Sequence, residues 1–180
     1  MTQLNELKGT LTLDPSHSEI GFVTRHAMVT KVRGSFSDFS GTATVDGANP
    51  STSSLEVTIQ AASISTRNED RDNHVRSGDF LDVETYPTIT FKATDFAVAD
   101  ETVTVTGDLT IHGVTKSIAI PFEFTGEAKD PFGNTRVGFE GSATVNRSDF
   151  GLTWNAALET GGFLVADKVV LEFEVSAIKA

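Results

Sequence analysis

Apolar and polar residues alternate along most of the chain, and β-branched and aromatic side chains fill most of the apolar positions. A repeat of two residues is typical of strands that bury one face and expose the other. The pattern predicts about nine strands. They lie at residues 11–13, 20–26, 36–45, 55–61, 89–93, 103–111, 118–124, 137–145 and 169–175. A sheet with one apolar face must close over that face, either as a sandwich or as a barrel.

Short clusters of turn-forming residues separate these predicted strands. The segments 98–102, 112–117 and 128–136 are typical of hairpin connections, so we expect the strands that they join to be antiparallel neighbours. Between Phe36 and Phe39 the alternation shifts by one residue, which indicates a bulge or a bend. Only residues 68–77 and 147–150 are candidates for helix, and both segments are short.

The predicted apolar faces contain an unusual share of small residues. These are Gly41, Ala43, Ala61, Ala93, Gly107, Gly141 and Ala143. Small residues can pack opposite the many phenylalanines of a filled core, or they can leave room inside a hollow barrel. A barrel of about eight strands is just wide enough to hold one small ligand. The alternation alone does not choose between the two.

Composition narrows the class of protein. The chain has 180 residues, a net charge of −11 and no cysteine. This length suits one domain, the missing cysteines exclude disulfides, and the negative charge disfavours nucleic acid as a partner. No apolar stretch is long enough to span a bilayer. The N-terminal residues 1–10 lack the apolar run of a signal peptide. We therefore expect a cytoplasmic protein, or a periplasmic or secreted one if a signal has been removed.

The sequence contains none of the common catalytic motifs. It has no GxSxG, no GxxxxGK[ST] and no HExxH, and its four histidines are His17, His26, His74 and His112. We therefore predict no catalytic residue, no metal and no cofactor. One alternative remains open, an enzyme that acts on a bound lipid or small ketone with His26, His74 or His112 as the proton donor.

The few basic residues gather in particular segments. Arg67, Arg71 and Arg76 crowd residues 65–80 with His74; Arg25, His26 and Arg33 flank the turn after the second predicted strand; Lys116 and Arg147 lie in or beside other turns. If these segments share one end of a barrel, they can bind an anionic group. For any single arginine we favour another interpretation, in which Arg71 and Arg147 form ion pairs with aspartates. The candidate partners are Asp70, Asp72, Asp79 and Asp149.

Five ordered blocks of sequence resemble the YceI-like proteins, which are lipid-binding barrels similar to lipocalins. The blocks are LDPSHSEIGFVTRH (13–26), VRGSFSDFSG (32–41), residues 63–91, VTGDLTIHGVTKSI (105–118), and NRSDFG (146–151) with the tail 161–175. The resemblance extends over residues 13–178. The chain has Phe80-Leu81 where family members often have two phenylalanines, and it lacks the secretion signal that many carry.

The resemblance implies a single all-β domain over residues 1–180. Its fold is an extended, lipocalin-like antiparallel barrel of about eight strands with one or two short helices at its ends. It also implies a non-enzymatic carrier, store or sensor of an isoprenoid lipid, such as a polyprenyl phosphate or a quinone. The predicted bore residues are Ile20, Phe22, Phe36, Phe39, Val57, Ile59, Phe80, Leu81, Phe91, Val105, Leu109, Ile111, Ile120, Phe122, Phe139, Ala143 and Phe173. The predicted head-group contacts are His26, Arg33, Arg71, His74 and Arg147.

The segment 69–80 is the most densely charged part of the chain. We interpret it as a short helix or loop across one end of the barrel, ordered by pairs between its acids and its arginines, with Val75, Phe80 and Leu81 turned inward. A solid barrel that makes protein contacts or protects against stress remains a further alternative. An exposed edge strand would also allow a homodimer.

Overall fold

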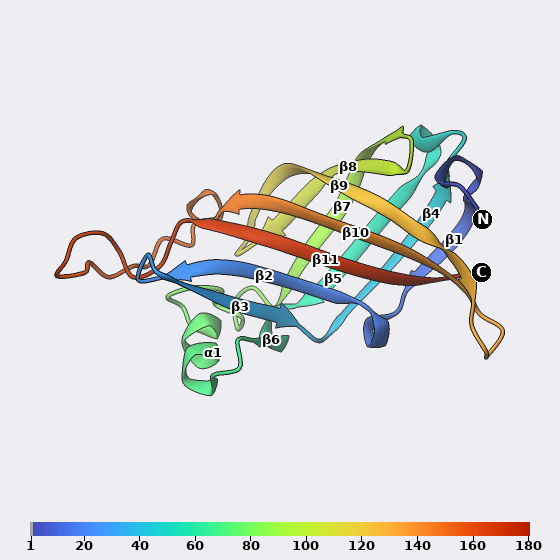
Figure 1. Ribbon diagram of the computed structural model, residues 1–180. Helices are drawn as coiled ribbons and strands as arrows, with labels where there is room; N and C mark the ends of the chain where they lie inside the picture. The colour runs from blue at the N-terminus through green and yellow to red at the C-terminus, as the bar shows by residue number, and fades with distance from the viewer. Residues whose placement is uncertain (1) are drawn as a thin grey trace.

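The alternating segments form an eleven-stranded antiparallel sheet, as a computed structural model of the chain shows for residues 2–180 (Figure 1). The strands are β1 (Lys8–Leu13), β2 (Glu19–His26), β3 (Thr30–Phe36), β4 (Phe39–Asp46), β5 (Ser54–Gln60), β6 (Ile64–Ser65), β7 (Thr88–Ala99), β8 (Thr102–Ile111), β9 (Val114–Lys129), β10 (Thr135–Asn146) and β11 (Lys168–Lys179). One α-helix, α1 (Glu69–Arg76), and five short 3₁₀ segments complete the fold: η1 (Leu4–Glu6), η2 (Pro15–His17), η3 (Pro50–Thr52), η4 (Ala61–Ser63) and η5 (Arg147–Phe150).

The sheet closes into a barrel because β11 pairs on both of its edges. The order β1-β4-β5-β7-β8-β9-β10-β11 returns to β1, with Leu11 opposite Lys179. The predicted antiparallel barrel of about eight strands is therefore confirmed, and so are the three hairpins β7–β8, β8–β9 and β9–β10. The edge of β11 that pairs with β1 near the C-terminus pairs with β2 nearer its start, where Val170 lies opposite Val23.

One end of the barrel is built differently from the rest. There β2, β3 and β6 extend the sheet past the closed ring, and β6 pairs only with β3 among the strands of residues 2–180. Between β6 and the start of β7 the wall consists of α1 and the segment 77–87. Figure 1 shows α1 beside the diverging strands, at the same end as the long loop 151–167. We call this end the mouth.

The predicted break between Phe36 and Phe39 is the junction of two strands. Before it, β3 pairs with β2; after it, β4 pairs with β1. The sequence did not indicate β3, because residues 30–35 contain Val32 as their only large aliphatic residue. Treating residues 36–45 as one strand was therefore wrong.

Both predicted helical segments are confirmed as α1 and η5. Helix α1 begins where the Asn68 side chain accepts a hydrogen bond from the Arg71 amide at 2.9 Å, and its first turn is acidic, as the helix dipole favours. Within residues 2–180 no arginine of this segment forms an ion pair with its acids. Instead the buried Asp72 carboxylate accepts a 2.7 Å hydrogen bond from the Thr66 amide. The expectation that ion pairs order the segment is wrong, because capping and backbone contacts do so.

The N-terminal residues close the barrel at the end opposite the mouth. Leu4 and Leu7 are buried in a second core cluster. The Leu4 amide donates to the Glu101 carboxylate at 3.2 Å, and the Gly47 amide donates to the Leu7 carbonyl at 2.8 Å. A Cβ on Gly47 would overlap the Leu4 carbonyl oxygen, so this close approach requires glycine. We call residues 4–7 the plug.

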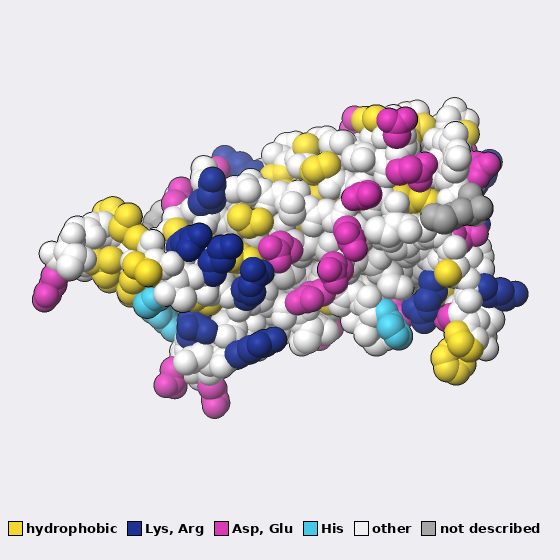
Figure 2. Space-filling model, in the orientation of Figure 1, with side chains coloured by type: hydrophobic (Ala, Val, Ile, Leu, Met, Phe, Trp, Pro, Cys, Tyr) yellow, Lys and Arg dark blue, Asp and Glu magenta, His cyan; other side chains and the backbone are white. Residues whose placement is uncertain are grey.

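A network of partly exposed charged side chains also stabilises that end. Arg136 donates to Asp14 at 2.6 Å and to Asp130 at 2.7 Å. Hydrogen bonds from Arg136, Ser16 and His17 hold the pKa of Asp14 well below its usual range. Elsewhere on the visible face, most charged side chains along the barrel are acidic, whereas basic side chains gather toward the mouth (Figure 2).

Candidate functional site

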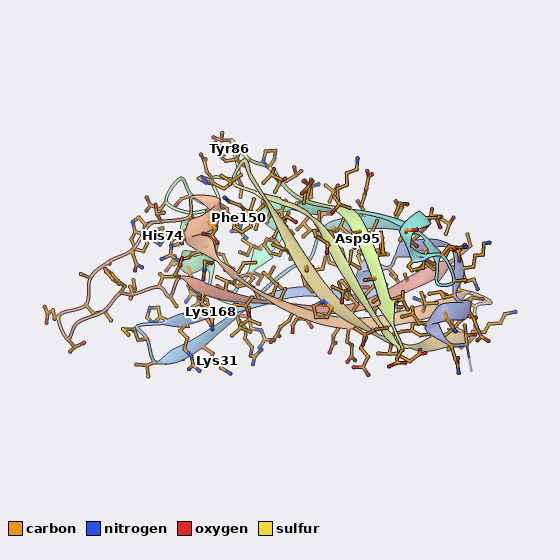
Figure 3. All side chains as sticks on the ribbon, turned by 90° about the horizontal axis from the view of Figure 1, so that it is seen from above. Lys31, His74, Tyr86, Asp95, Phe150 and Lys168 are labelled. Carbon is orange, nitrogen blue, oxygen red and sulfur yellow. The ribbon has the colours of Figure 1, made fainter. Side chains whose placement is uncertain are left out.

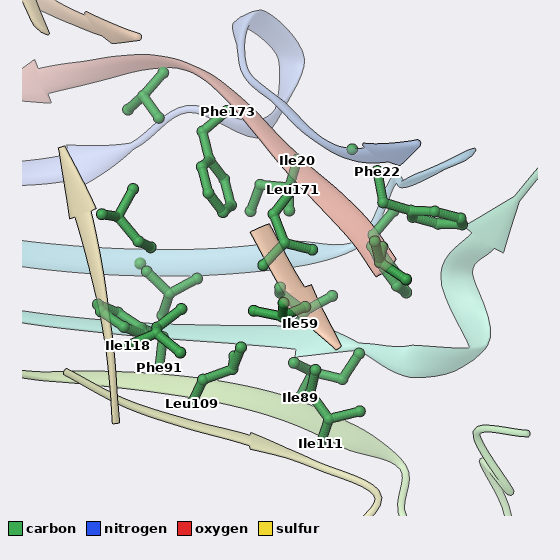
Figure 4. A pocket seen from close by; sticks show the side chains of 18 of the residues that line it. Ile20, Phe22, Ile59, Ile89, Phe91, Leu109, Ile111, Ile118, Leu171 and Phe173 are labelled. Atoms are coloured by element: carbon green, nitrogen blue, oxygen red, sulfur yellow. The ribbon is translucent and has the colours of Figure 1, made fainter. Parts of the chain in front are cut away.

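A cavity of about 740 Å³ lies inside the barrel. Ligand pockets commonly measure about 300–1,000 Å³. Side chains from facing strands point into it, among them Ile20, Ile59 and Leu171 (Figure 4). The interior is therefore hollow, as one of the two interpretations of the small residues requires.

The structure brings most of the predicted bore residues to this cavity. It is lined by Ile20, Phe22, Phe36, Val57, Ile59, Phe80, Leu81, Phe91, Val105, Leu109, Ile111, Ile120, Phe122, Phe139 and Phe173. Phe39 and Ala143 do not line it. Phe39 is 5% exposed and packs in the wall where β4 begins. Ala143 lies opposite Leu171, whose longer side chain reaches the cavity instead. Binding of a ligand by the lining residues stays a prediction.

The glycines of the wall hold phenylalanine rings. A Cβ on Gly107 would lie 2.5 Å from the Phe91 ring, and one on Gly141 would lie 2.7 Å from the Phe122 ring. Gly34 is covered by Phe22 in the same way, and these two residues are direct cross-strand partners. Larger residues at the three positions would push the rings toward the cavity. The small residues therefore serve both as packing partners and as the means of keeping the bore open.

Polar lining residues concentrate at the mouth. His26 ends β2, Arg71 and His74 lie on α1, and Arg147 begins η5. Figure 3 shows His74 and Phe150 at this end, with Lys31 and Lys168 beside them. Asp46 lines the opposite end, where it accepts hydrogen bonds from the amides of the turn after β4. The cavity thus joins an apolar bore to a polar, partly basic mouth.

Arg147 is buried at the mouth, with 8% of its surface exposed. Its guanidinium donates to the carbonyls of Ala166 at 2.9 Å and Trp154 at 2.9 Å, and also to those of Leu152 and Val165. Burial lowers the pKa of Arg147, and the charge of Asp167 partly offsets that effect. Arg147 therefore organises the 151–167 loop and places a positive charge against the cavity.

Arg71 also uses backbone and hydroxyl acceptors. Its Nε donates to the Thr66 hydroxyl and its Nη2 to the Thr66 carbonyl, both at 2.7 Å. Neither Arg71 nor Arg147 has a carboxylate within ion-pair distance in the part of the chain that the structure describes. The ion-pair interpretation of these two arginines is wrong. Their charge is not directly neutralised, and both line the cavity.

An aromatic cluster that the sequence did not indicate surrounds these charges. The rings of His74 and Trp154 lie 4.6 Å apart, and those of Phe80 and Trp154 lie 5.3 Å apart. The Arg147 guanidinium is 6.0 Å from the centre of the Phe80 ring. His74 Nε2 lies 2.9 Å from the Asp79 carboxylate. Trp154 is the only tryptophan of the chain, and no strand or helix was predicted around it.

The remaining predicted contact, Arg33, is not at the mouth. It lies on the outer face of β3, where its Nη1 is 3.4 Å from the Glu172 carboxylate. The inward positions of this strand are Val32, Gly34 and Phe36, so the odd-numbered Arg33 must face outward. His17 and His112 do not line the cavity either.

The structure offers no metal centre and no membrane-crossing helix within residues 2–180. No group of three or more His, Asp or Glu side chains there is arranged to hold a metal ion. None of the helices in the same range is long and apolar enough to cross a bilayer.

Comparison with known proteins identifies relatives over most of the chain. Residues 11–177 match the YceI-like domain family. A UPF0312 protein of Pseudomonas aeruginosa is 43% identical over 136 residues, which cover 76% of this chain and 71% of that protein. A UPF0312 protein of Ectopseudomonas mendocina is also 43% identical, over 138 residues that cover 76% of this chain and 72% of that protein.

Solved structures share the barrel. BcnA of Burkholderia cenocepacia matches with a TM-score of 0.80 and 27% identity, covering 91% of this chain and 98% of that one. The YceI protein of Campylobacter jejuni matches with a TM-score of 0.73 and 34% identity, covering 87% and 90%. A polyisoprenoid-binding domain from Saccharophagus degradans has the same fold, with a TM-score of 0.69 at 18% identity over 97% of this chain and all of that one (100%). Together with the matched family, these likenesses show that the chain belongs to the YceI-like proteins.

Proposed function

We propose that this protein binds a long-chain isoprenoid or similar amphiphilic lipid, with its chain in the bore and its head at the mouth, and carries that lipid without chemical turnover. The observation that carries the proposal is the cavity of about 740 Å³ that is apolar along the barrel and basic at one end. A polyprenyl phosphate or a quinone has the matching division into chain and head.

The bore supplies the affinity. Burying a lipid chain releases about 0.8 kcal/mol for each methylene-sized group. A few isoprene units therefore outweigh the cost of ordering the chain. The wall of Phe91, Phe122 and aliphatic side chains is continuous with the buried core, so a lipid chain inside it contacts almost no polar atoms.

The mouth supplies the contacts for the head. Arg71 and Arg147 present charges that no carboxylate pairs with directly, and His74 and Trp154 add a ring face beside them. A phosphate would be attracted by both guanidinium groups. A quinone ring would stack in the same aromatic cluster. The hydrocarbon chain of the lipid thus supplies most of the binding free energy, and the head group determines which lipid is preferred.

The relatives support a binding function. The Saccharophagus degradans domain is described as polyisoprenoid-binding, and it shares this fold. Membership of the YceI-like family also favours a binding protein over an enzyme.

Native mass spectrometry followed by organic extraction tests the proposal. We expect the purified protein to carry an excess mass of one lipid, and the extract to contain an isoprenoid. Extracted protein should also bind added polyprenyl phosphate or quinone, with a change in Trp154 fluorescence. If the protein shows no excess mass and binds neither lipid when it is added, the proposal is wrong.

The same lipids distinguish a carrier from an enzyme. The carrier returns the added lipid chemically unchanged after prolonged incubation. An enzyme would convert it, and His74→Gln would abolish that conversion while the lipid still bound.

A further inference from the structure

We propose that the mouth docks on the surface of an anionic phospholipid bilayer, through an apolar tip and an adjoining basic patch. This inference goes beyond lipid binding in the bore, because docking does not require cargo. It is drawn from two surface features at the rim of the cavity, of which only Arg25 also lines the cavity, and from their position relative to the mouth.

The apolar tip consists of Met28, Val29 and Phe163. Met28 is 64% exposed and Val29 is 74% exposed in the β2–β3 turn, and Phe163 is 58% exposed in the 151–167 loop. Large apolar residues that are exposed together often mark a site of contact with a protein or a membrane. Figure 2 shows hydrophobic side chains gathered over this protruding loop.

The two segments of the tip are held to each other. The Ala27 amide donates to the Leu164 carbonyl at 2.7 Å, and the Ala166 amide donates to the Arg25 carbonyl at 3.1 Å. Ala27 and Met28 both have positive φ, 51° and 64°. Such angles are uncommon for residues other than glycine and carry a cost in backbone energy. The tip is thus a fixed projection of two joined turns.

The basic patch consists of Arg25, Lys31 and Lys168. Arg25 and Lys31 are direct cross-strand partners on β2 and β3. Lys168 begins β11 beside them, where its carbonyl accepts from the Thr24 hydroxyl at 3.4 Å. Like charges directly opposite one another destabilise a sheet. Within residues 2–180 none of the three forms an ion pair, whereas the next basic residue along β3, Arg33, is paired with Glu172.

Charge and position together favour a bilayer as the occupant. The protein has a net charge of −11, so its field as a whole repels an anionic membrane. Only a local basic surface reverses that repulsion, and this one adjoins the apolar tip and the cavity mouth (Figures 2 and 3). Two acidic residues, Glu159 and Asp167, lie on the same loop as Phe163 and are exposed, and Asp167 directly precedes Lys168 of the patch. In the docked state the tip enters the interface, the patch contacts the head groups, and the mouth faces the membrane that supplies or receives a lipid.

Cosedimentation with vesicles tests the docking. The full chain is first freed of cargo by organic extraction, so that the result does not depend on the proposed lipid binding. It is then mixed with sucrose-loaded vesicles of phosphatidylcholine alone or with phosphatidylglycerol. Each basic side chain near an anionic surface strengthens binding about fivefold. The double variant Lys31→Gln and Lys168→Gln should therefore bind phosphatidylglycerol vesicles on the order of 30-fold more weakly. Val29→Ser and Phe163→Ser should weaken the residual, salt-resistant part of binding.

Matched controls lie at the opposite end of the barrel. Phe132 is 88% exposed in the β9–β10 turn, and Lys129 is exposed beside it. Phe132→Ser and Lys129→Gln remove the same kinds of side chain and should leave binding unchanged. The proposal is overturned if the wild type does not sediment with phosphatidylglycerol vesicles, or if the controls lose as much as the mouth variants. It is also overturned if Phe163→Ser instead abolishes a dimer in sedimentation equilibrium while vesicle binding is unchanged, because the tip would then join two copies of the chain.

Discussion

A variant that fills the bore halfway along its length tests whether the lipid chain lies inside the barrel. Val105 is buried, lines the cavity and precedes Leu109 and Ile111, which lie nearer the mouth on the same strand. In Val105→Phe the side chain gains about four carbon atoms, so it displaces about four methylene-sized groups of a long lipid chain at about 0.8 kcal/mol each. The expected loss is about 3 kcal/mol, or a roughly 150-fold weaker dissociation constant.

The empty protein should respond differently from the loaded one. Adding methylene groups to a filled core costs about 1–3 kcal/mol. Because the cavity has room, we expect Val105→Phe to change the free energy of unfolding of the extracted protein by less than about 1 kcal/mol. Urea unfolding measures the change in the free energy of unfolding. Titration with lipid, followed by Trp154 fluorescence, measures the change in the dissociation constant.

Two comparisons complete the experiment. A lipid of farnesyl length, held near the mouth, should bind the variant and the wild type equally well. Thr104→Phe adds a ring at the neighbouring position, which faces outward from the barrel. It should change the binding of neither the short nor the long lipid. If Val105→Phe costs 1–3 kcal/mol of stability but leaves binding of long chains intact, the bore is not the lipid site.

Three other changes test the mouth, the plug and the acid sensitivity of the barrel. Arg71→Gln should weaken a polyprenyl phosphate by about 1.5–3 kcal/mol, as expected for a hydrogen bond to a charged group, while binding of a neutral quinone stays nearly unchanged in calorimetry. Gly47→Ala should displace the Leu4 backbone, and faster hydrogen exchange of residues 4–7 would show it. Partial burial tends to raise the pKa of Asp130, but hydrogen bonds from Arg136 and the neighbouring backbone outweigh it and lower that pKa to about 2. An unfolded aspartate titrates near about 3.9. The stabilisation is therefore present above about pH 4 and is lost as the pH falls toward 2. Arg136→Gln should flatten this part of the stability profile in acid titrations monitored by circular dichroism.

The alternation of the sequence was enough to predict most of the strands and which of their residues face inward, whereas the choice of a barrel over a sandwich came from the resemblance to the YceI-like proteins. In a strand, the position of a residue decides which face it occupies, so Phe91, Leu109 and Ile120 were correctly assigned to the inside. The same rule would have excluded Arg33, had β3 been recognised as a strand. Its weak apolar signal hid the phase that turns this arginine outward.

Contacts outside the strands could not be predicted in the same way. Arg71 and Arg147 have aspartates nearby in sequence, yet backbone carbonyls or a hydroxyl satisfy them. Sequence proximity does not reveal such acceptors, because every residue carries a carbonyl. The plug at Leu4 and Leu7 has no alternation to mark it, and Trp154 lies in a loop whose path depends on Arg147.

Beside β6 the wall of the barrel is formed by α1 and the segment 77–87 and not by paired strands, and this has a kinetic consequence. If the proposed lipid enters the bore here, it needs only the eight-residue helix to move aside, whereas parting two strands would require breaking many hydrogen bonds at once. Local openings of this kind require much less free energy than global unfolding. On the proposed function, we therefore expect lipid exchange and heat resistance to depend on separate parts of the molecule, so that substitutions under α1 alter the exchange half-time while the melting temperature hardly moves.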